Sequence, residues 1–430
     1  MTVGRTMGRW ARALGTGLLA AAVLVPVSGA ATAAATPAGQ DLPHPLSITA
    51  GRSFTCTLIS DGSVWCFGEN SNGNLGNGTT TKSSVPVRVE RRTGPLTPPV
   101  PLTNAVAVAA GTAHACAIRQ DTTVWCWGWN AFGSLGDGTE IQRNRAVQVR
   151  KENGDPLTNA VGIGLGAVSS CAVTSGGAGF CWGDTNTAGI GDGGGVARFR
   201  AVRIRKSDGS LLTGVAQVDA GAYHVCARTT GGAAWCMGAN GSGAVGDGTS
   251  TNRTLFVRVE KAGGGFLTGV TAISAGNNLS CAVAAGGAAY CWGTGSATGT
   301  GTTKNVLRVA TPVKTTTLAP LTEMVDARAG AGSACARGAD GRVWCWGSNQ
   351  GGRLLDGTTT DRNLAALAEK NGATPIAGAI SMDVGEYHVC VTGEDLFDRC
   401  GGMNYNGQLG DGTTIDRRRA VPVLATWILG

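Results

Sequence analysis

The chain has 430 residues, of which 70 are glycine, 5% are aromatic and 15% are charged, and its formal net charge is +7. This length accommodates one large repeat domain or two to three ordinary domains, and the dense glycine argues against long helices. The positive charge is too mild to indicate a nucleic-acid-binding protein.

The first 35 residues are typical of a secretory signal peptide, and residues 36–45 form a short N-terminal segment. A basic start precedes an apolar stretch over residues 13–27, which is too short to span a membrane comfortably, and small residues follow it as cleavage sites. No second apolar stretch follows. We therefore expect a secreted mature chain without a stable membrane anchor, made in a compartment that permits disulfides.

The cysteines indicate an internal repeat. They form seven pairs with a spacing of ten: Cys56 and Cys66, Cys116 and Cys126, Cys171 and Cys181, Cys226 and Cys236, Cys281 and Cys291, Cys335 and Cys345, Cys390 and Cys400. Residues 56–66, CTLISDGSVWC, predict a β-hairpin that places its two cysteines opposite each other, so we expect one disulfide per repeat. Zinc fits less well because the pairs lack the short spacing of zinc ligands and the chain has four histidines; buried free thiols are the remaining alternative.

The residues around each cysteine pair predict four strands per repeat. In VWCWGWN at residues 124–130, side-chain alternation puts two tryptophans on one face and the cysteine on the other, as in a sheet packed between two similar sheets. An apolar run ending in glycine (105–111), a glycine turn (133–139) and an alternating strand (145–151) complete the unit. Four antiparallel strands in about 55 residues predict an all-β, seven-bladed β-propeller over residues 46–430.

The succession AG-x-x-H-x-C-A, DG-x-V-W-C-W-G-x-N, G-x-L-G-D-G-T and R-x-x-V-x-V resembles the regulator of chromosome condensation repeat over residues 46–425. The resemblance implies a propeller closed into a ring, here of a secreted bacterial type. The best-known activity of the family, nucleotide exchange on a small nuclear GTPase with chromatin contact, is not expected of a secreted chain. More distantly, the chain resembles the propeller-type β-lactamase-inhibitory proteins, in which loop aromatics on one face grip the enzyme.

The last repeat departs from the pattern. Arg399 and Gly401 replace the aromatics beside Cys400, so we expect a looser blade or one reshaped by ring closure.

Several recurring polar residues are expected to serve the blades. The glycine turns share an aspartate: Asp137, Asp192, Asp247, Asp356 and Asp411. Its place before glycine indicates an Asx-type turn, and its spacing matches no calcium loop. His114, His224 and His388 precede a first cysteine by two residues on different repeats, where they cannot form a joint metal site. With no nucleophile–base pair or phosphate loop in the sequence, we expect no enzyme, no metal and no cofactor.

The fourth strands carry many basic residues: Arg143, Arg145, Arg150, Lys151, Arg198, Arg200, Arg203, Arg205, Lys206, Arg417, Arg418 and Arg419. Charge on an exposed edge deters pairing with another chain. Weak binding to a polyanion, such as a cell-wall polymer, is the alternative.

Six aromatic residues break the repeat: Phe54, Trp129, Phe132, Tyr223, Tyr387 and Tyr405. A loop aromatic that the blade does not require is either extra packing or a contact anchor. We therefore expect an extracellular, non-catalytic, monomeric scaffold that presents one propeller face to another protein or a cell-wall polymer, and not to nucleic acid. A secreted inhibitor of an enzyme such as a β-lactamase and an enzyme that uses the central funnel are the alternatives.

Overall fold

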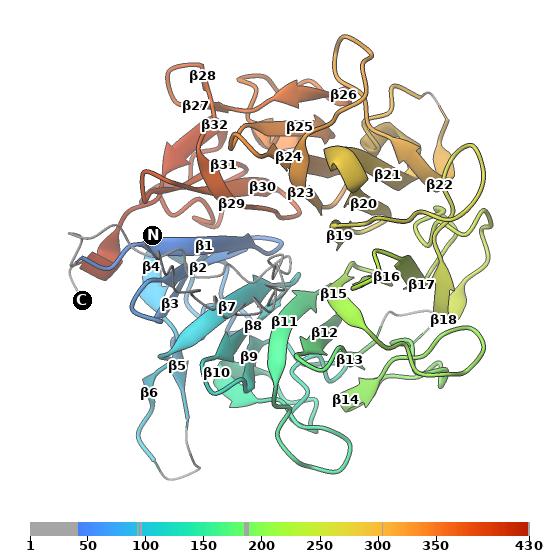
Figure 1. The fold of residues 1–430 in the computed structure, drawn as a ribbon. Coiled ribbons are helices and arrows are strands. Elements are labelled where there is room, and N and C mark those ends of the chain that lie inside the picture. The colour runs from blue at the N-terminus through green and yellow to red at the C-terminus, as the bar shows by residue number, and fades with distance from the viewer. Residues whose placement is uncertain (1–41, 93, 95–96, 185–188, 303, 429–430) are drawn as a thin grey trace, which may run out of the picture.

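The computed structural model describes residues 42–92, 94, 97–184, 189–302 and 304–428. The predicted signal peptide, residues 1–35, lies outside the described residues. Seven β-sheets stand around a central axis as the blades of a propeller (Figure 1). Each blade has four antiparallel strands in chain order, and its first strand lies innermost. The predicted all-β, seven-bladed fold is confirmed.

The blades have the following strands. Blade 1 has β1 (Pro45–Ala50), β2 (Phe54–Ile59), β3 (Val64–Gly68) and β4 (Ser83–Arg88); blade 2 has β7 (Ala105–Ala110), β8 (His114–Arg119), β9 (Val124–Gly128) and β10 (Arg143–Gln148); blade 3 has β11 (Ala160–Leu165), β12 (Ser169–Thr174), β13 (Gly179–Gly183) and β14 (Arg198–Arg203); blade 4 has β15 (Val215–Ala220), β16 (His224–Thr229), β17 (Ala234–Gly238) and β18 (Arg253–Arg258). Blade 5 has β19 (Ala272–Ala275), β20 (Leu279–Ala284), β21 (Ala288–Thr294) and β22 (Val306–Pro312); blade 6 has β23 (Met324–Ala329), β24 (Ser333–Gly338), β25 (Val343–Gly347) and β26 (Arg362–Leu367); blade 7 has β29 (Ala379–Val384), β30 (His388–Gly393), β31 (Asp398–Gly402) and β32 (Arg417–Pro422).

Short elements lie between and after the blades: β5 (Glu90–Arg91), β6 (Val100–Pro101), β27 (Glu369–Lys370), β28 (Thr374–Pro375) and the 3-10 helices η1 (Ala285–Gly287), η2 (Gly295–Ala297), η3 (Gln350–Gly352) and η4 (Thr426–Ile428). None of the helices within the described ranges has the length and apolar character needed to cross a membrane.

One disulfide joins the second and third strands of every blade. In blade 1, Cys56 lies directly opposite Cys66, and all seven bridges have Cα–Cα distances of 4.0–4.1 Å. The pairing confirms the predicted disulfides and leaves no cysteine free for the metal or thiol alternatives.

The two faces of the third strand pack against different blades. Trp125 and Trp127 of blade 2 share a core cluster with the Cys56–Cys66 bridge of blade 1, while the cysteines of blade 2 cluster with the aromatics of blade 3. The Trp127 side chain is fully buried, and its Nε1 donates a hydrogen bond of 2.9 Å to the backbone oxygen of Asn74 in blade 1. Blades 1 and 2 therefore bury their disulfides beneath the aromatics of the next blade, as the alternation predicts, whereas the disulfide of blade 6 lies in a cluster without aromatic residues.

A ring of seven glycines surrounds one mouth of the central channel. A glycine directly follows each first strand: Gly51, Gly111, Gly166, Gly221, Gly276, Gly330 and Gly385. An added Cβ at any of them would overlap the carbonyl oxygen of the equivalent glycine in the next blade. The close approach of neighbouring backbones explains why every predicted apolar run ends in glycine.

The linkers between blades cover the outer edges of the fourth strands. Each linker forms one parallel bridge to the fourth strand of the blade that follows it: Arg91 with Ala146, Lys151 with Ala201, Lys206 with Phe256, Lys261 with Ala310, Thr315 with Ala365, and Lys370 with Ala420. Backbone pairing as well as charge therefore protects six of the seven outer edges.

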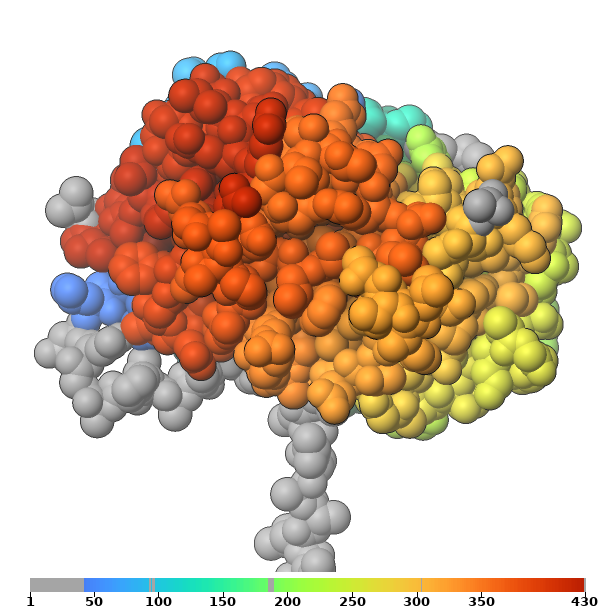
Figure 2. Space-filling view, turned by 90° about the horizontal axis from the view of Figure 1, so that it is seen from above, coloured from blue at the N-terminus to red at the C-terminus, as the bar shows by residue number. Residues whose placement is uncertain are grey.

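The seventh junction, between blades 7 and 1, is closed by the C-terminal segment instead of a linker. Pro86 occupies the position in β4 at which Ala201 and Phe256 use their backbone N–H to bond the preceding linker. Proline has no N–H to leave unpaired there. The Thr426 hydroxyl donates to the Pro86 oxygen at 2.9 Å, and Trp427 is buried in the core shared by blades 7 and 1. The blue N-terminal residues accordingly lie beside the red C-terminal blade (Figure 2).

Candidate functional site

The turns after the first strands and the loops after the third strands meet at one end of the propeller, because the strands of a blade alternate in direction. We call this end the top face; it contains the glycine ring. All six aromatic candidates lie at or beside it. Trp129, Phe132 and Tyr405 are in loops after third strands, while Tyr223 and Tyr387 are in turns before second strands.

Phe54, the sixth candidate, is the first residue of β2 and is fully buried. Its ring lies against Gly51 and belongs to the core cluster between blades 1 and 2. The prediction that Phe54 anchors a partner is therefore wrong. Its side chain packs between blades 1 and 2 and is not available at the surface.

Trp129 and Phe132 form an aromatic pair on blade 2. Their ring centroids are 5.8 Å apart and the rings meet edge to face, at 79°. Both are half-buried. In the same loop the side chain of Ile141 is 61% exposed, which is unusual for an isoleucine. The loop thus presents three large apolar side chains.

Tyr387 and Tyr405 form a second pair on blade 7, with centroids 6.4 Å apart. Residues of blade 1 bind both rings: the Ser53 hydroxyl lies 3.0 Å from the Tyr405 hydroxyl, and Arg52 Nη2 donates to the Tyr387 hydroxyl at 3.3 Å. Ile415, on the same loop as Tyr405, is 61% exposed. The sequence separates blades 1 and 7 by more than 300 residues, and ring closure brings them into contact.

We call Trp129, Phe132, Ile141, Tyr387, Tyr405 and Ile415 the apolar arc. Its members lie on blades 7 and 2, the two blades that flank blade 1 in the ring. Tyr223 is 39% exposed but lies on blade 4, outside the arc. The two isoleucines were not among the sequence candidates. A comparison of the repeats could have found them, because Thr81, Thr251 and Thr360 hold the same place in three other blades.

The aspartates of the glycine turns make hydrogen bonds and ion pairs within their own blades. Asp137 accepts hydrogen bonds from the backbone N–H and the hydroxyl of Thr139, and its other oxygen is bridged by Arg143 at 2.7 Å. The same bridge recurs in four more blades: Asp192 with Arg198, Asp247 with Arg253, Asp356 with Arg362, and Asp411 with Arg417. Burial opposes ionisation of Asp247, but bonds from Thr249 and Arg253 outweigh it and lower its pKa. The predicted Asx-type turn is confirmed.

Ion pairs of this kind, with aspartate or glutamate, engage several of the basic residues on the fourth strands. Arg145 is paired with Glu90 and Arg419 with Glu369, both at 2.7 Å and both across a blade junction. Paired guanidinium groups leave less free charge for a polyanion than the sequence suggests.

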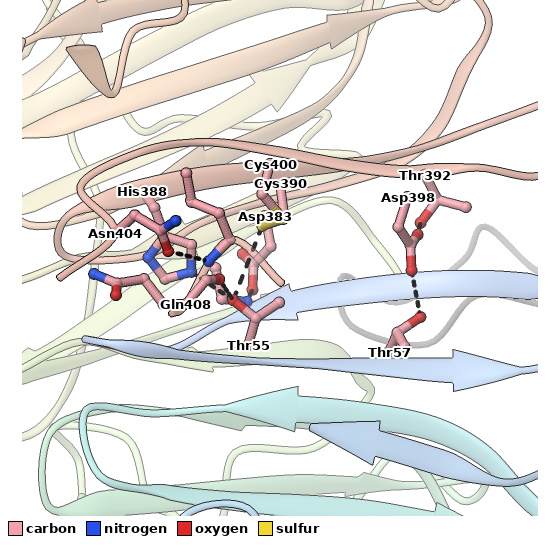
Figure 3. Close-up of a disulfide and its surroundings, with 12 residues drawn as sticks. Thr55, Thr57, Asp383, His388, Cys390, Thr392, Asp398, Cys400, Asn404 and Gln408 are labelled. Atoms are coloured by element: carbon pink, nitrogen blue, oxygen red, sulfur yellow. Dashed lines mark hydrogen bonds between the residues drawn. A yellow bond between two sulfur atoms is a disulfide. The ribbon is translucent and has the colours of Figure 1, made fainter. Parts of the chain in front are cut away.

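The three histidines join neighbouring blades. Nε2 of His114 lies 2.8 Å from the Ser170 hydroxyl, that of His224 lies 2.7 Å from the Ser280 hydroxyl, and that of His388 lies 2.7 Å from the Thr55 hydroxyl (Figure 3). Each hydroxyl donates to a backbone carbonyl, so the histidine Nε2 carries the proton. Burial lowers the pKa of His114 and His224 to about 4, which keeps both neutral.

A signal for these pairs is present in the sequence. The residue before the first cysteine is a serine or threonine only in the blades that follow a histidine blade. In the other blades it is apolar: Ala115, Val225, Ala334 and Val389.

The central channel holds small polar cavities. Cavities of about 60 Å³ and 70 Å³ lie at the glycine ring and beneath it. Glu386 of blade 7 crosses the mouth, where it pairs with Arg52 at 2.7 Å and accepts a bond of 3.1 Å from Asn277 of blade 5. Deeper, burial raises the pKa of Asp219 to about 6. Ligand pockets are typically about 300–1,000 Å³, so these cavities fit only small species such as water.

Comparisons with known proteins agree with this architecture. Residues 61–118 match the family described as "Regulator of chromosome condensation (RCC1) repeat", and residues 46–74, 105–134 and 215–244 match a second description of the same repeat. In the yeast RCC1 (Prp20) structure, solved bound to Kap60, the fold is similar with a TM-score of 0.67 at 16% identity, covering 99% of this chain and 92% of that one. The chain is thus a seven-bladed propeller in which residues 46–134 and 215–244 match the RCC1 repeat.

Among curated proteins, the ultraviolet-B receptor UVR8 of Arabidopsis thaliana is 26% identical over 212 residues, which are 49% of this chain and 45% of that protein. The human E3 ubiquitin-protein ligase HERC2 is 27% identical over 324 residues, which are 75% of this chain and 6% of that protein. The chain therefore spans less than half the length of either relative.

Proposed function

We propose that this chain is an extracellular, non-catalytic binding scaffold whose top face holds a protein or cell-surface partner. The apolar arc carries the proposal. Its loop side chains depart from the repeat, and two isoleucines are 61% exposed where three other blades have threonine and blade 3 has the exposed Val196. Exposed clusters of large apolar side chains are features of interaction sites on soluble proteins.

A protein partner fits the arc better than a cell-wall polymer does. The arc is rich in tryptophan and tyrosine, the residues enriched among energetic anchors of protein interfaces. Six of the twelve basic residues that a polyanion would contact on the fourth strands are engaged in ion pairs, such as Arg145 with Glu90. The seven buried disulfides and the predicted leader support an oxidising, extracellular location. An inhibitor of a secreted enzyme would use the same face, whereas an enzyme in the funnel would need more room than the channel cavities of about 60–70 Å³ provide.

The test compares the secreted protein with two variants, each immobilised and exposed to culture supernatant and cell-wall extract. The arc variant is Trp129→Ala with Tyr405→Ala. The control is Tyr223→Ala, an exposed tyrosine on blade 4. We expect the wild type and the control to retain the same partner and the arc variant to lose it, since truncating an anchor costs about 1–3 kcal/mol. Any retained enzyme is then assayed for inhibition.

The thermal midpoint must stay within a few degrees of the wild type for this reading to hold. A large fall in the midpoint with unchanged binding would show that Trp129 belongs to the core. Equal retention by both variants would place the binding surface elsewhere.

A further inference from the structure

The junction between blades 7 and 1 is the one place in the ring where no peptide linker connects neighbouring blades. At the other six junctions the chain passes directly from one blade to the next and bridges its outer strand, as Lys206 bridges Phe256. At the seventh junction the contact with β4 comes from η4, through the bond from Thr426 to Pro86. Non-covalent contacts alone therefore hold this junction closed.

Several of those contacts are hydrogen bonds between buried or half-buried groups, and one of them, between Thr57 and Asp398, has no counterpart at the junction of blades 4 and 5. Thr49 and the backbone N–H of Ala50 donate to the Asp383 carboxylate at 2.8 and 2.9 Å. Nearer the opposite end of the strands, the Thr57 hydroxyl donates to Asp398 at 2.6 Å, and Thr392 donates to the other carboxylate oxygen at 2.7 Å (Figure 3). Together with the pair of Thr55 and His388, they form a row of hydrogen bonds along the junction.

The Thr57–Asp398 pair replaces apolar residues. At the junction of blades 1 and 2 the same two positions are Ala117 and Val64, which lie in one hydrophobic cluster. Every other blade has alanine or valine in place of Thr57, and every other blade has valine, alanine or glycine in place of Asp398. Water can satisfy a carboxylate and a hydroxyl when they separate, but it cannot compensate for exposed apolar surface. Separation therefore costs less free energy at this junction than an apolar one would require.

On the top face, residues that contact one another lie on opposite sides of this junction. Tyr387 and Tyr405 belong to blade 7, while Arg52 and Ser53, which bind their hydroxyls, belong to blade 1. We propose that the junction of blades 7 and 1 is a latch that opens locally while the other six junctions stay closed, and that its opening separates the two parts of the apolar arc. The consequence for binding rests on the proposed function; the opening itself does not.

Hydrogen exchange of the free protein tests the latch at matched amides. The N–H of Ala50 is bonded to Asp383 across the latch, and that of Glu386 to the Gly51 oxygen. The junction of blades 4 and 5 has the same two bonds, from Ala275 to Asp219 and from Ala222 to Gly276. Residue-resolved exchange measured by NMR should be at least about tenfold faster for the two latch amides than for their counterparts.

A variant that makes the latch apolar provides the second arm. Thr57→Ala, Thr392→Val and Asp398→Val together install residue types found in other blades and leave no buried hydroxyl unpaired at Thr392. Exchange of the Ala50 and Glu386 amides should slow by about tenfold, with no change at blades 4 and 5. Equal exchange at both junctions of the wild type would overturn the latch even if the variant does not fold. Unchanged exchange in a folded variant would overturn the role of the polar pair. Because no partner is present, neither result depends on whether the arc binds one.

Discussion

Leu355 of blade 6 fills the space that Gly401 of blade 7 leaves empty. A Cβ added at Gly401 would overlap Cδ2 of Leu355, and Leu355 is fully buried. Leu355 stands where the other glycine turns have a glycine, and it adopts a φ of 63°, a left-handed conformation that leucine seldom takes. Gly401 stands where most blades have an aromatic residue beside the second cysteine.

The other junctions show the reverse arrangement. A Cβ at Gly136 would lie 2.9 Å from the Trp182 ring of the next blade, and one at Gly246 would lie 2.6 Å from the Trp292 ring. A small turn residue faces a large aromatic there, whereas a large turn residue faces a glycine between blades 6 and 7. The two departures from the repeat thus compensate each other, and blade 7 keeps all four strands.

This compensation predicts strong coupling in a double-mutant cycle. Gly401→Trp alone forces the indole against Leu355 and should destabilise the protein by about 1–3 kcal/mol or more. Leu355→Gly alone leaves a cavity, at a cost of about 2–5 kcal/mol, reduced by relief of the left-handed leucine. The double variant rebuilds the arrangement of the other junctions. It should be more stable than the sum of the single effects by at least about 1 kcal/mol. Additive midpoints in denaturant titrations would refute the compensation.

The glycine ring predicts position-specific intolerance. Gly221→Ala places a methyl group onto the Gly276 oxygen and disturbs the bond of 3.2 Å that Ala222 donates to it. We expect a loss of at least about 3 kcal/mol or a failure to secrete folded protein. Gly176→Ala is the matched control, because nothing lies within 4 Å of its added Cβ. Secretion yield and the unfolding midpoint distinguish the two variants. Similar behaviour of both would show that the ring can expand.

The buried histidines predict sensitivity to acid. The folded pKa of His224 is about 4, below its ordinary value of 6.5, so the unfolded chain binds the proton first. The contribution of this group to stability is complete above about pH 6.5 and falls as the pH drops toward 4, by about 1.4 kcal/mol per pH unit. Asp219 and Asp398 act in the opposite direction, because burial raises their pKa to about 6.

A double variant, His224→Leu with Ser280→Ala, isolates the contribution of His224 to the pH dependence of stability. It copies the apolar residues Leu279 and Ala334, which hold the same two positions between blades 5 and 6. Between pH 7 and pH 5 this variant should lose less stability than the wild type, by about 2 kcal/mol. Denaturant midpoints at the two pH values provide the measurement. Equal losses in the two proteins would mean that His224 is not protonated on unfolding in this range.

The sequence predicted what every repeat shares. The equal cysteine spacing recurs seven times, and at least one aromatic residue flanks the second cysteine in six repeats, so disulfides, strands and most of the packing of blade on blade follow from these local signals. Features that exist once have no such support. Phe54 looked like a free aromatic because its sequence neighbours do not reveal that Gly51 and blade 2 enclose it. The meeting of Tyr405 with Ser53 depends on ring closure, which contacts between the two ends of the chain decide.

The last prediction concerns the C-terminal segment and its contribution to the stability of the closed ring. Trp427 is 6% exposed and packs with Phe67 of blade 1 and the Cys390–Cys400 bridge of blade 7, so it belongs to both ends of the ring. Trp427→Ala should cost about 3–5 kcal/mol, the usual range for a buried tryptophan. Ile428→Ala is the control one residue away, where the side chain is 48% exposed and a change within about 0.5 kcal/mol is expected. The loss should be concentrated at the latch, so that exchange of the Ala50 amide accelerates more than that of Ala275. If Trp427→Ala lowers the protection of both amides equally, the segment stabilises the whole ring and is not specific to its closure.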